Sequence, residues 1–535
     1  MCRETGVEIR ALEACPSLAT HFFLSASRRP NALALSVRDR DVTYSELSAY
    51  ANRISNWIRA RCTRESPRIG ILASRSWEAY AGILGASWAG GAYVPLNPDW
   101  PEERLANALN IAALDALILD HQGLILLSGK LSRLVPENLL LPSSNSSFSL
   151  GADRPTTIVC GTDVLSPVDD SSPEETKPSQ LAYLMFTSGT TGLPKGVMIS
   201  VGNMSDFLVG FQNRFEFAPE DRVSQTFELT FDLSVMSMLA AWTSGASLHV
   251  VPANQLMGPS RFIREKQLSI WFSVPSTIAC MRTLRMLTPG AFPTLRYSGF
   301  CGEPLPLASA EAWHAAAPNS LLDNLYGPTE ATIACLAQRY VPDEPVVTKE
   351  RGIIAIGKPF AGTNAAIVDP SNTFLAAGER GELALSGGQI SSGYLNDAKK
   401  TAARFPVVTG EVWYLTGDFA YMDEYGLFHH LGRTDHQVKV LGNRVELEEI
   451  ESYLRLICKT ESVAAVAWPV VDGSAQGIVA FVSGCNSSVA LIRENMSRCV
   501  PKYMVPGKIF VLESLPLTFS GKVDRNALQQ RLVGN

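Results

Sequence analysis

The stretch FTSGTTGLPKG at residues 186–196 is rich in glycine and hydroxyl groups, ends in a lysine and could bind phosphate. A nucleotide-hydrolysing P-loop needs Gly, four residues and then Gly-Lys-Ser or Gly-Lys-Thr. Here Lys195 precedes a glycine, and every other Gly-Lys pair is followed by Leu, Pro, Ile or Val. Two interpretations remain. The stretch is a solvated turn between strands, or its amides, hydroxyls and lysine form an anion-binding loop.

Three further polar stretches carry side chains that could act beside a phosphate group. NLYGPTE at 324–330 is a Gly-Pro turn with a helix-capping threonine, or a nucleotide site with an acidic metal ligand. TGD at 416–418 is an ordinary turn, or a carboxylate suited to hydroxyl groups. Lys522, in SGKVDR, is a surface charge, or a cation between two negatively charged reactants. No stretch decides the question alone.

Composition narrows the class of protein. At 535 residues the chain is longer than one hydrophobic core normally supports, so we expect two or more domains. A hydrophobic content of 46% with 18% charged residues is typical of soluble globular proteins. The formal net charge of −6 and the lack of a Lys/Arg run give no reason to expect a nucleic acid or a membrane as partner.

The thiols and the N-terminus favour a cytoplasmic protein. The ten cysteines form no C-x-x-C pair and the seven histidines have no ligand spacing, which indicates reduced thiols and no structural zinc. Residues 1–15 lack the apolar core of a secretory signal.

The elements that must hold these stretches alternate between helix and strand. Thr43 and Glu46 form a capping box before an amphipathic helix, and residues 79–96 predict a Gly/Ala-packed helix, a turn at Gly90-Gly91 and a buried strand. Residues 181–186, LAYLMF, predict a strand that leads into the phosphate-binding stretch. The pattern indicates an α/β protein whose sheet is buried on both faces. VELEEIESYLRLI at 445–457 predicts a further amphipathic helix in a small α+β domain.

Eight stretches resemble, in order and spacing, the core motifs of the adenylate-forming superfamily. This superfamily contains acyl-CoA synthetases, firefly luciferases and nonribosomal peptide synthetase adenylation domains. The stretches are TYSELSAYAN, AGGAYVPLNPDWPEERL, LAYLMFTSGTTGLPKGVMIS, FDLSVMSMLAAWTSGASL, NLYGPTEAT, YLTGDFA, GRTDHQVKVLGNRVELEEIE and LPLTFSGKVDRNAL. QVK, RVELEEIE and GKVDR resemble amino-acid-activating members more than acyl-CoA synthetases. FDLSVM and FCGEPLP are similar to free-standing D-alanine:carrier-protein ligases.

The resemblance implies a large N-terminal domain of mixed sheets and helices, residues 1–434, and a small mobile α+β domain, residues 435–535. It also implies two reactions. A carboxylate attacks the α-phosphate of ATP and releases pyrophosphate, and the acyl adenylate then passes to a thiol.

The same resemblance implies a role for each nucleotide-site residue. The loop residues would hold the β- and γ-phosphates: Thr187, Ser188, Gly189, Thr190, Thr191 and Lys195. Around the nucleotide, Tyr326 would lie on the adenine face, Asn324 on the adenine edge, Thr329 near the α-phosphate and Glu330 on Mg²⁺, while Asp418 and Arg433 would bind the ribose. Lys522 would be the catalytic lysine. Asp435 matches the family's hinge position, and Lys439 and Gly442 resemble residues presented to the active site during thiol transfer.

Asp232, in FDLSVM, is the most informative residue for substrate choice. It is either a helix N-cap or a carboxylate in a mostly apolar pocket. A buried carboxylate is costly unless a cation pairs with it, and the α-ammonium of an amino acid supplies one. We therefore expect an amino acid rather than a plain carboxylic acid.

The other pocket positions implied by the resemblance form a mainly apolar lining: Leu233, Met236, Ser273, Gly299, Cys301, Leu325, Ile333 and Ala334. A lining without a second charge disfavours a charged substrate side chain. Met236 and Cys301 are similar to the alanine ligases, whereas Gly299 is expected to leave extra room. Cys301 is expected to pack rather than act as a nucleophile, because no histidine lies nearby in sequence. We expect alanine first, in either stereochemistry, and then another small neutral amino acid or proline.

The sequence contains no carrier domain with a phosphopantetheine-bearing serine, so the accepting thiol is expected on a separate carrier protein. Two alternatives stay open. A coenzyme A ligase for an organic acid would share the fold and the first step, and an inactive binding relative would keep the fold alone.

Overall fold

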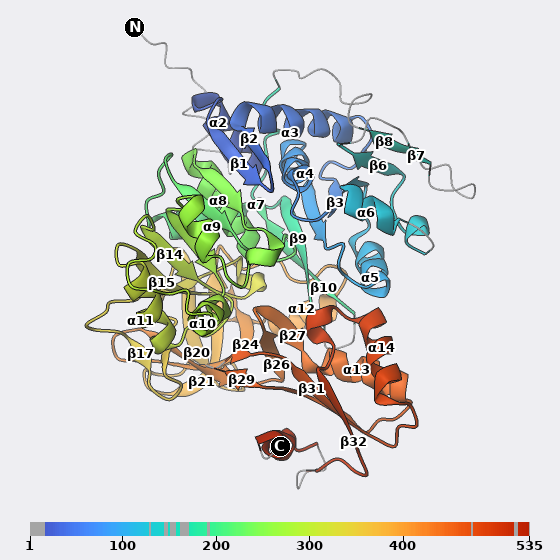
Figure 1. Ribbon diagram of the computed structural model, residues 1–535, viewed down its shortest axis with the longest axis vertical. Coiled ribbons are helices and arrows are strands. Elements are labelled where there is room, and N and C mark those ends of the chain that lie inside the picture. Colours follow the sequence, from blue (N-terminus) through green and yellow to red (C-terminus); the bar gives the residue numbers. More distant parts are fainter. Residues whose placement is uncertain are drawn as a thin grey trace.

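The computed structural model describes residues 16–127, 130–143, 148–149, 157–160, 171–189, 193–471, 474–517 and 523–533. Lys522, Thr190 and Thr191 lie outside these residues. Helices and sheets from residues 18–433 form a large body. The elements from Gln437 onward, orange to red in Figure 1, lie together at one end of it. No helix in the described part of the chain is both long enough and apolar enough to cross a membrane.

The first large sheet has the strand order β10-β9-β4-β3-β5-β6-β8-β7. Its strands are β3 (Arg68–Leu72), β4 (Ala92–Leu96), β5 (Ala116–Leu119), β6 (Asn138–Leu141), β7 (Phe148–Ser149), β8 (Thr157–Cys160), β9 (Leu181–Thr187) and β10 (Lys195–Ser200). Strands β3, β4, β5 and β6 pair in parallel. Their continuous apolar runs are buried on both faces, as expected of parallel strands covered by helices.

The second large sheet has the order β19-β16-β15-β14-β13-β11-β12-β1-β2. Its strands are β1 (Leu33–Val37), β2 (Arg40–Thr43), β11 (Arg222–Gln225), β12 (Ser247–Val250), β13 (Ile270–Ser273), β14 (Tyr297–Phe300), β15 (Leu321–Tyr326), β16 (Leu336–Arg339) and β19 (Lys358–Pro359). The neighbours β11, β13, β14 and β15 run parallel. Their carboxyl ends therefore meet at one edge, where open α/β sheets bind ligands.

Helices of the large body pack on these sheets. They are α2 (Leu18–Arg28), α3 (Tyr44–Arg59), α4 (Trp77–Trp88), α5 (Glu102–Ala112), α6 (His121–Leu126), α7 (Val201–Gln212), α8 (Leu233–Ser244), α9 (Ser260–Glu265), α10 (Pro275–Thr283), α11 (Leu307–Ala316) and α12 (Ala398–Arg404), with 3₁₀ turns η1 (Leu131–Arg133), η2 (Ala253–Gln255) and η3 (Thr329–Ala331). The capping box predicted at Thr43 and Glu46 is present and starts α3. The helix, turn and strand predicted at 79–96 are α4, a turn at Gly90 and β4.

A third, antiparallel sheet follows in the order β20-β21-β24-β25. Its strands are β20 (Thr363–Val368), β21 (Arg380–Gly387), β24 (Tyr414–Met422) and β25 (Phe428–Arg433). Two short hairpins accompany it: β17 (Val347–Thr348) with β18 (Ile353–Ile354), and β22 (Val407–Val408) with β23 (Glu411–Val412). The pairing of β24 with β25 sets Asp418 opposite Arg433.

The C-terminal elements form their own two sheets. One contains β26 (Gln437–Val440), β27 (Asn443–Glu446), β29 (Val470–Val471) and β30 (Ser474–Ala475), and the other β28 (Val463–Ala467), β31 (Ile478–Ser483) and β32 (Lys508–Leu512). Around them lie α13 (Leu447–Cys458), α14 (Val489–Cys499), η4 (Lys502–Met504) and α15 (Arg525–Val533). The predicted amphipathic helix is α13, which buries Leu447, Ile450 and Leu454 in the core of this region.

Candidate active site

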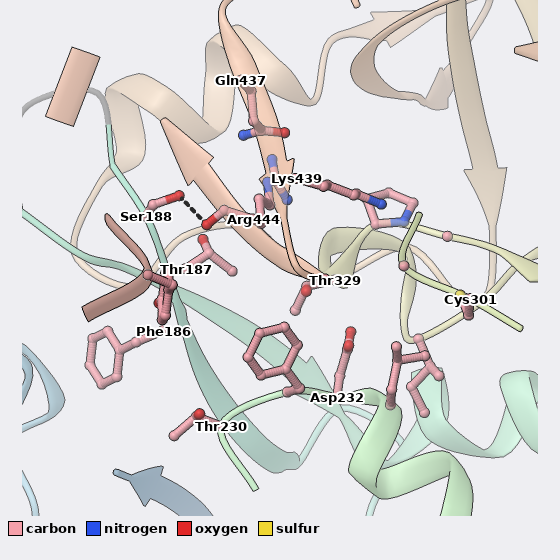
Figure 2. Close-up of a pocket in the computed structure, with 18 of the residues that line it drawn as sticks. Phe186, Thr187, Ser188, Thr230, Asp232, Cys301, Thr329, Gln437, Lys439 and Arg444 are labelled. Atoms are coloured by element: carbon pink, nitrogen blue, oxygen red, sulfur yellow. Dashed lines mark hydrogen bonds between the residues drawn. The ribbon is translucent and has the colours of Figure 1, made fainter. Parts of the chain in front are cut away.

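A cavity of about 100 Å³ lies where the end of β9, the start of α8, the turn after β15 and the β26–β27 hairpin meet. Figure 2 shows Asp232 and Thr329 pointing toward one another across it, with Lys439 and Arg444 entering from the hairpin. Residues far apart in sequence therefore share one space.

Asp232 is held at the start of α8 with its carboxylate in the cavity. Asp232 occupies the N-cap position of α8, but its side chain makes no capping hydrogen bond. Burial raises the pKa of Asp232 to about 6, although hydrogen bonds from the Thr329 side chain and the Ile333 amide oppose the shift. The Oδ2 atom is buried without a hydrogen-bond partner among the described residues. An unpartnered buried carboxylate oxygen favours a cationic ligand.

The apolar wall beside Asp232 is made by Leu233, Cys301 and Ile333. The other predicted pocket residues are buried in the surrounding core: Met236, Ser273, Gly299, Leu325 and Ala334. Burial raises the pKa of the Cys301 thiol to about 12, as expected for a packing residue rather than a nucleophile.

The prediction that Gly299 leaves extra room is wrong. A Cβ atom on Gly299 would lie 3.0 Å from two atoms of the Phe272 ring and 3.1 Å from Leu325 Cδ1. Phe272 stands directly opposite Gly299 on the neighbouring strand β13, so both face the same side of the sheet. The Phe272 ring therefore fills the space beside Gly299.

The phosphate-binding stretch contacts the C-terminal elements. Lys195 Nζ lies 3.0 Å from Glu446 Oε1, and both side chains are buried. The Gly189 amide donates to Glu449 Oε2 at 3.0 Å, while Ser188 Oγ donates to the Arg444 carbonyl oxygen at 3.0 Å (Figure 2). The Thr187 hydroxyl is buried with no partner within the described residues. Carboxylates thus lie on the lysine and on an amide that were predicted to bind phosphate.

Glu330, the predicted Mg²⁺ ligand, is completely buried in η3. Its Oε2 atom lies 2.7 Å from Arg444 Nη1, and Tyr394 donates to Oε1 at 2.8 Å. Burial alone would raise the pKa of Glu330, but the Arg444 guanidinium and the Lys195 ammonium lower it to about 2. The carboxylate is therefore ionised, as a ligand of a hard cation must be.

Asp418 lies at the centre of a second polar cluster. Arg433 Nη1 lies 2.7 Å from Asp418 Oδ1, the Tyr326 hydroxyl donates to Oδ2, and His430 Nε2 is 3.3 Å from Oδ1. Burial opposes ionisation, yet Arg433 and the hydrogen bonds of His430 and Tyr326 hold the pKa of Asp418 far below its usual range. The side chain of Asn324, the residue predicted at the adenine edge, bonds to the main chain: its amide donates to the carbonyl oxygens of Ile354 and Ala355.

An adjoining cavity of about 240 Å³ shares Tyr326, Asp418 and Arg433 with the first. Its wall adds Asn324, Leu325 and the apolar side chains of Ile353, Ile354 and Ile356. A largely apolar group with hydroxyls at one end would suit this lining.

The β26–β27 hairpin brings Lys439 and Gly442 to these cavities. Burial lowers the pKa of the Lys439 ammonium. The Gly442 amide donates to Glu303 Oε1 at 2.5 Å, and a Cβ atom here would lie 2.8 Å from Val274 Cγ1. Gly442 also has a φ of +81°, so glycine suits this position for two reasons. Asp435, the predicted hinge residue, pairs with Arg433 at 2.6 Å.

Several residues of the site were not predicted. Arg444, Glu446, Glu449 and Glu303 hold the hairpin and α13 against the large body. The first three belong to the motif GRTDHQVKVLGNRVELEEIE, and Glu446 and Glu449 fall within the stretch predicted as an amphipathic helix. Their outward-facing charges were the available signal, but nothing in the sequence says what those charges meet.

Comparison with known proteins identifies the family. The family model described as AMP-binding enzyme matches residues 22–395. The chain belongs to this family of AMP-binding enzymes. It is an AMP-forming ligase of the adenylation-domain type, as the motif series predicted.

Relatives of this AMP-binding enzyme include large peptide synthetases. Tyrocidine synthase 2 of Brevibacillus parabrevis is 33% identical over 94% of the chain, which spans 13% of that protein. Gramicidin S synthase 1 of Brevibacillus brevis is 30% identical over 94% of the chain, which spans 43% of it.

A solved structure confirms the α/β fold. It is the Vibrio cholerae adenylation domain AlmE in complex with glycyl-adenosine-5′-phosphate, with a TM-score of 0.84 and 32% identity. The match covers 97% of this chain and 98% of AlmE.

Proposed function

We propose that this chain activates a small neutral amino acid as its aminoacyl adenylate and passes the aminoacyl group to the phosphopantetheine thiol of a separate carrier protein. ATP is the nucleotide substrate and pyrophosphate the first product. Alanine is the first candidate, in either stereochemistry, and glycine, proline or another small neutral amino acid follows.

The single observation that carries the amino-acid assignment is the unpartnered Oδ2 atom of Asp232. The cavity around it offers Leu233, Cys301 and Ile333 as apolar neighbours. An α-ammonium would pair with the carboxylate and remove the cost of burying its charge. A carboxylic acid without an amine would leave that cost in place.

The size of the pocket supports a small side chain. The cavity of about 100 Å³ has to hold the amino acid and the reacting phosphate together. Phe272 and Leu325 close the space at Gly299, and Leu233 and Val274 lie within contact distance of a Cβ atom built on Gly302. The glycyl adenylate in the similar AlmE structure makes glycine the main competitor of alanine.

In the adenylation step, we assign each residue a role from the charge or polar group that it offers to ATP. Thr187, Ser188, Gly189, Thr190, Thr191 and Lys195 would hold the β- and γ-phosphates, and Lys522 would stabilise the negative charge that develops between the substrate carboxylate and the α-phosphate. Thr329 would lie beside that phosphate. Tyr326 and Asn324 would bind adenine, and Asp418 with Arg433 the ribose.

Glu330 fits the Mg²⁺ that enters with ATP. Mg²⁺ is usually held by one or two carboxylates together with substrate phosphates, and Glu330 is an ionised, buried carboxylate within Coulombic reach of Lys195 of the phosphate loop. The ion would neutralise phosphate charge. Glu330 itself would exchange Arg444 for the ion, which requires the β26–β27 hairpin to move.

The described arrangement supports the thiol-transfer step. Glu446 and Glu449 lie on the groups proposed to hold phosphate, while Lys439 and Gly442 line the cavity. A groove of about 210 Å³ includes Phe231 and Gly442, which also line the active-site cavity, and Met257, which is half exposed. A thiol on a long flexible arm could reach the adenylate along it.

We propose that residues 1–434 and 435–535 are the two domains and that Asp435 is their hinge. Every described strand after Gln437 pairs only with others of that region. A rotation there would remove Glu446 and Glu449 from the phosphate loop and bring Lys522 to the reactants.

The test is amino-acid-dependent exchange of labelled pyrophosphate into ATP, across the common L- and D-amino acids, with Lys522→Ala as the control. One strong responder that is lost in the variant would support reaction and substrate together. If no amino acid supports exchange and the protein consumes coenzyme A with an organic acid, the protein is an acyl-CoA ligase and this proposal is wrong.

A further inference from the structure

The turn that carries Ile333 has a strained backbone. Thr332 and Ile333 have φ angles of +54° and +72°. Residues branched at Cβ rarely adopt positive φ, and such conformations persist only where the surrounding structure enforces them. Ile333 contributes to Asp232 in two ways, because its amide hydrogen-bonds the carboxylate and its side chain forms a wall of the cavity. Whatever enforces this turn therefore acts on the substrate pocket.

Gln389 is the residue that enforces it. Its side chain is completely buried, and Nε2 lies 2.8 Å from the carbonyl oxygen of Ala334 and 3.3 Å from those of Ala331 and Thr332. The amide group of one side chain thus contacts three carbonyl oxygens of the same turn. Buried carbonyl groups need donors, and few other conformations of the turn would place all three around a single amide.

The contact is reciprocal and the amide is itself oriented. Thr332 Oγ1 donates to the main-chain carbonyl oxygen of Gln389 at 2.6 Å. Thr363 Oγ1 donates to the side-chain oxygen, Gln389 Oε1, at 2.9 Å. Because Oε1 accepts from Thr363, the amide nitrogen must face the turn. On the far side, a Cβ atom at Gly327 would lie 2.5 Å from Ala334 Cα, so the turn also has no room to relax in that direction.

We propose that Gln389 is a positioning residue for amino-acid recognition, which holds the strained Thr332–Ile333 turn so that Ile333 presents its amide to Asp232 and its side chain to the substrate. This inference rests on the proposed amino-acid activation. Gln389 acts through the turn rather than by touching substrate.

The test is the pyrophosphate exchange assay on Gln389→Leu, with the amino acid to which the wild type responds. The substitution keeps similar volume and removes the amide that fixes the turn. We expect the KM for the amino acid to rise about 10-fold or more, because small misplacements of positioning groups cost up to about 100-fold. The KM for ATP should change by less than about 2-fold. The preference for the small amino acid over valine should fall about 10-fold, since the Ile333 wall is no longer fixed.

Gln338→Leu is the matched control. Gln338 lies on β16, the strand that follows the turn, and its side-chain amide donates to the Arg339 carbonyl oxygen rather than to the turn. Both KM values and the amino-acid preference should stay at wild-type levels in this variant.

A second pair of variants covers the case in which Gln389→Leu does not fold. Thr332→Ala removes the hydroxyl that binds Gln389, and Thr332→Ser keeps it. We expect the amino-acid KM to rise about 3-fold in Thr332→Ala and to return toward wild type in Thr332→Ser.

Three results would overturn the inference while leaving the proposed function in place. An unchanged amino-acid KM in Gln389→Leu would do so, as would a parallel rise of both KM values, which a merely structural role predicts. Equal behaviour of Thr332→Ala and Thr332→Ser would do the same if only these variants fold. A wild type silent with every amino acid overturns the proposed function and the inference together, so the two failures are distinguishable.

Discussion

Asp232 combines burial, a pKa of about 6 and an unpartnered oxygen. A group perturbed in this way inside a cavity is typical of a functional site. Its neighbour Thr329 supplies a hydrogen bond but no charge. The Asp232 carboxylate therefore favours a cationic ligand, because its Oδ2 atom has no partner among the described residues.

At this scale we predict the effect of Asp232→Asn, which keeps the shape of the side chain and removes its charge. Hydrogen bonds to charged groups contribute about 1.5–3 kcal/mol, so the KM for the amino acid should rise roughly 10- to 100-fold. The KM for ATP should stay near the wild-type value. Steady-state pyrophosphate exchange measures both, with Asp99→Asn on the exposed surface as control. An unchanged amino-acid KM would contradict the role of Asp232.

The same carboxylate predicts a pH dependence. Above about pH 6 Asp232 is ionised and can pair with an ammonium group, and below about pH 6 it gains a proton and loses the pairing. Therefore kcat/KM for the amino acid should fall about 10-fold per pH unit as the pH drops below about 6. A pH profile of the wild type should show this acidic limb, and that of Asp232→Asn should not. A limb of equal slope in both proteins would assign it to another group.

Among the elements, the β26–β27 hairpin and the start of α13 have the greatest effect on the candidate active site. They place Arg444 on Glu330, Glu446 on Lys195 and Glu449 on the Gly189 amide. Removing one partner of a buried ion pair costs about 3–5 kcal/mol, so loss of these carboxylates should weaken the docking of the hairpin. Lys195, the Gly189 amide and Glu330 are the groups proposed to bind the phosphates and Mg²⁺. They cannot do so while the hairpin and α13 occupy them.

From this we predict that Glu446→Gln combined with Glu449→Gln separates the two reactions. Loss of the docking contacts should slow transfer of the aminoacyl group to a carrier thiol by about 10-fold or more. Pyrophosphate exchange should stay within about 2-fold of wild type. Single-turnover transfer and exchange assays measure the two steps. Glu494→Gln, on the exposed face of α14, should change neither. Equal loss in both assays would indicate a general folding defect.

Considered whole, the molecule is a large body and a smaller C-terminal region joined next to Arg433 and Asp435. Besides the contacts to the phosphate loop, the buried pair Arg104–Glu449, 3.0 Å apart, ties α5 to α13. The C-terminal region has its own apolar core around Ile450, Leu454 and Ile492. We therefore expect it to stay folded when its contacts to the large body are lost.

This organisation predicts the pattern of limited proteolysis. Thr434 and His436 are exposed, and the Thr434 amide donates to the Gly417 carbonyl oxygen at 2.9 Å. The Glu446→Gln, Glu449→Gln variant should therefore be cut near residues 433–439 by trypsin several-fold faster than wild type, because opening the interface exposes this connection. The fragments should correspond to residues 1–434 and 435–535 within a few residues. Cleavage elsewhere at the same rate in both proteins would argue against the proposed boundary.

Local physics explains which elements were predictable. The Thr43–Glu46 capping box, the helical spacing of Leu447, Ile450 and Leu454, and the apolar run of β9 depend on neighbours within a few residues. These elements are present as predicted. The series of eight stretches in turn predicted the family and the reaction class, because their order and spacing along nearly the whole chain resemble those of one superfamily.

Other features depend on contacts that no local pattern encodes. Phe272 fills the space at Gly299 because β13 and β14 pair in that register, which reversed the expected effect of the glycine. Glu446 and Glu449 looked like the polar face of a helix until the fold set them against Lys195 and Gly189. Gln389 gained its role from a turn more than fifty residues earlier. The sequence by itself determined which chemical groups this protein has, and only the tertiary structure decided which of them meet, because packing and ion pairing between distant segments depend on three-dimensional neighbours.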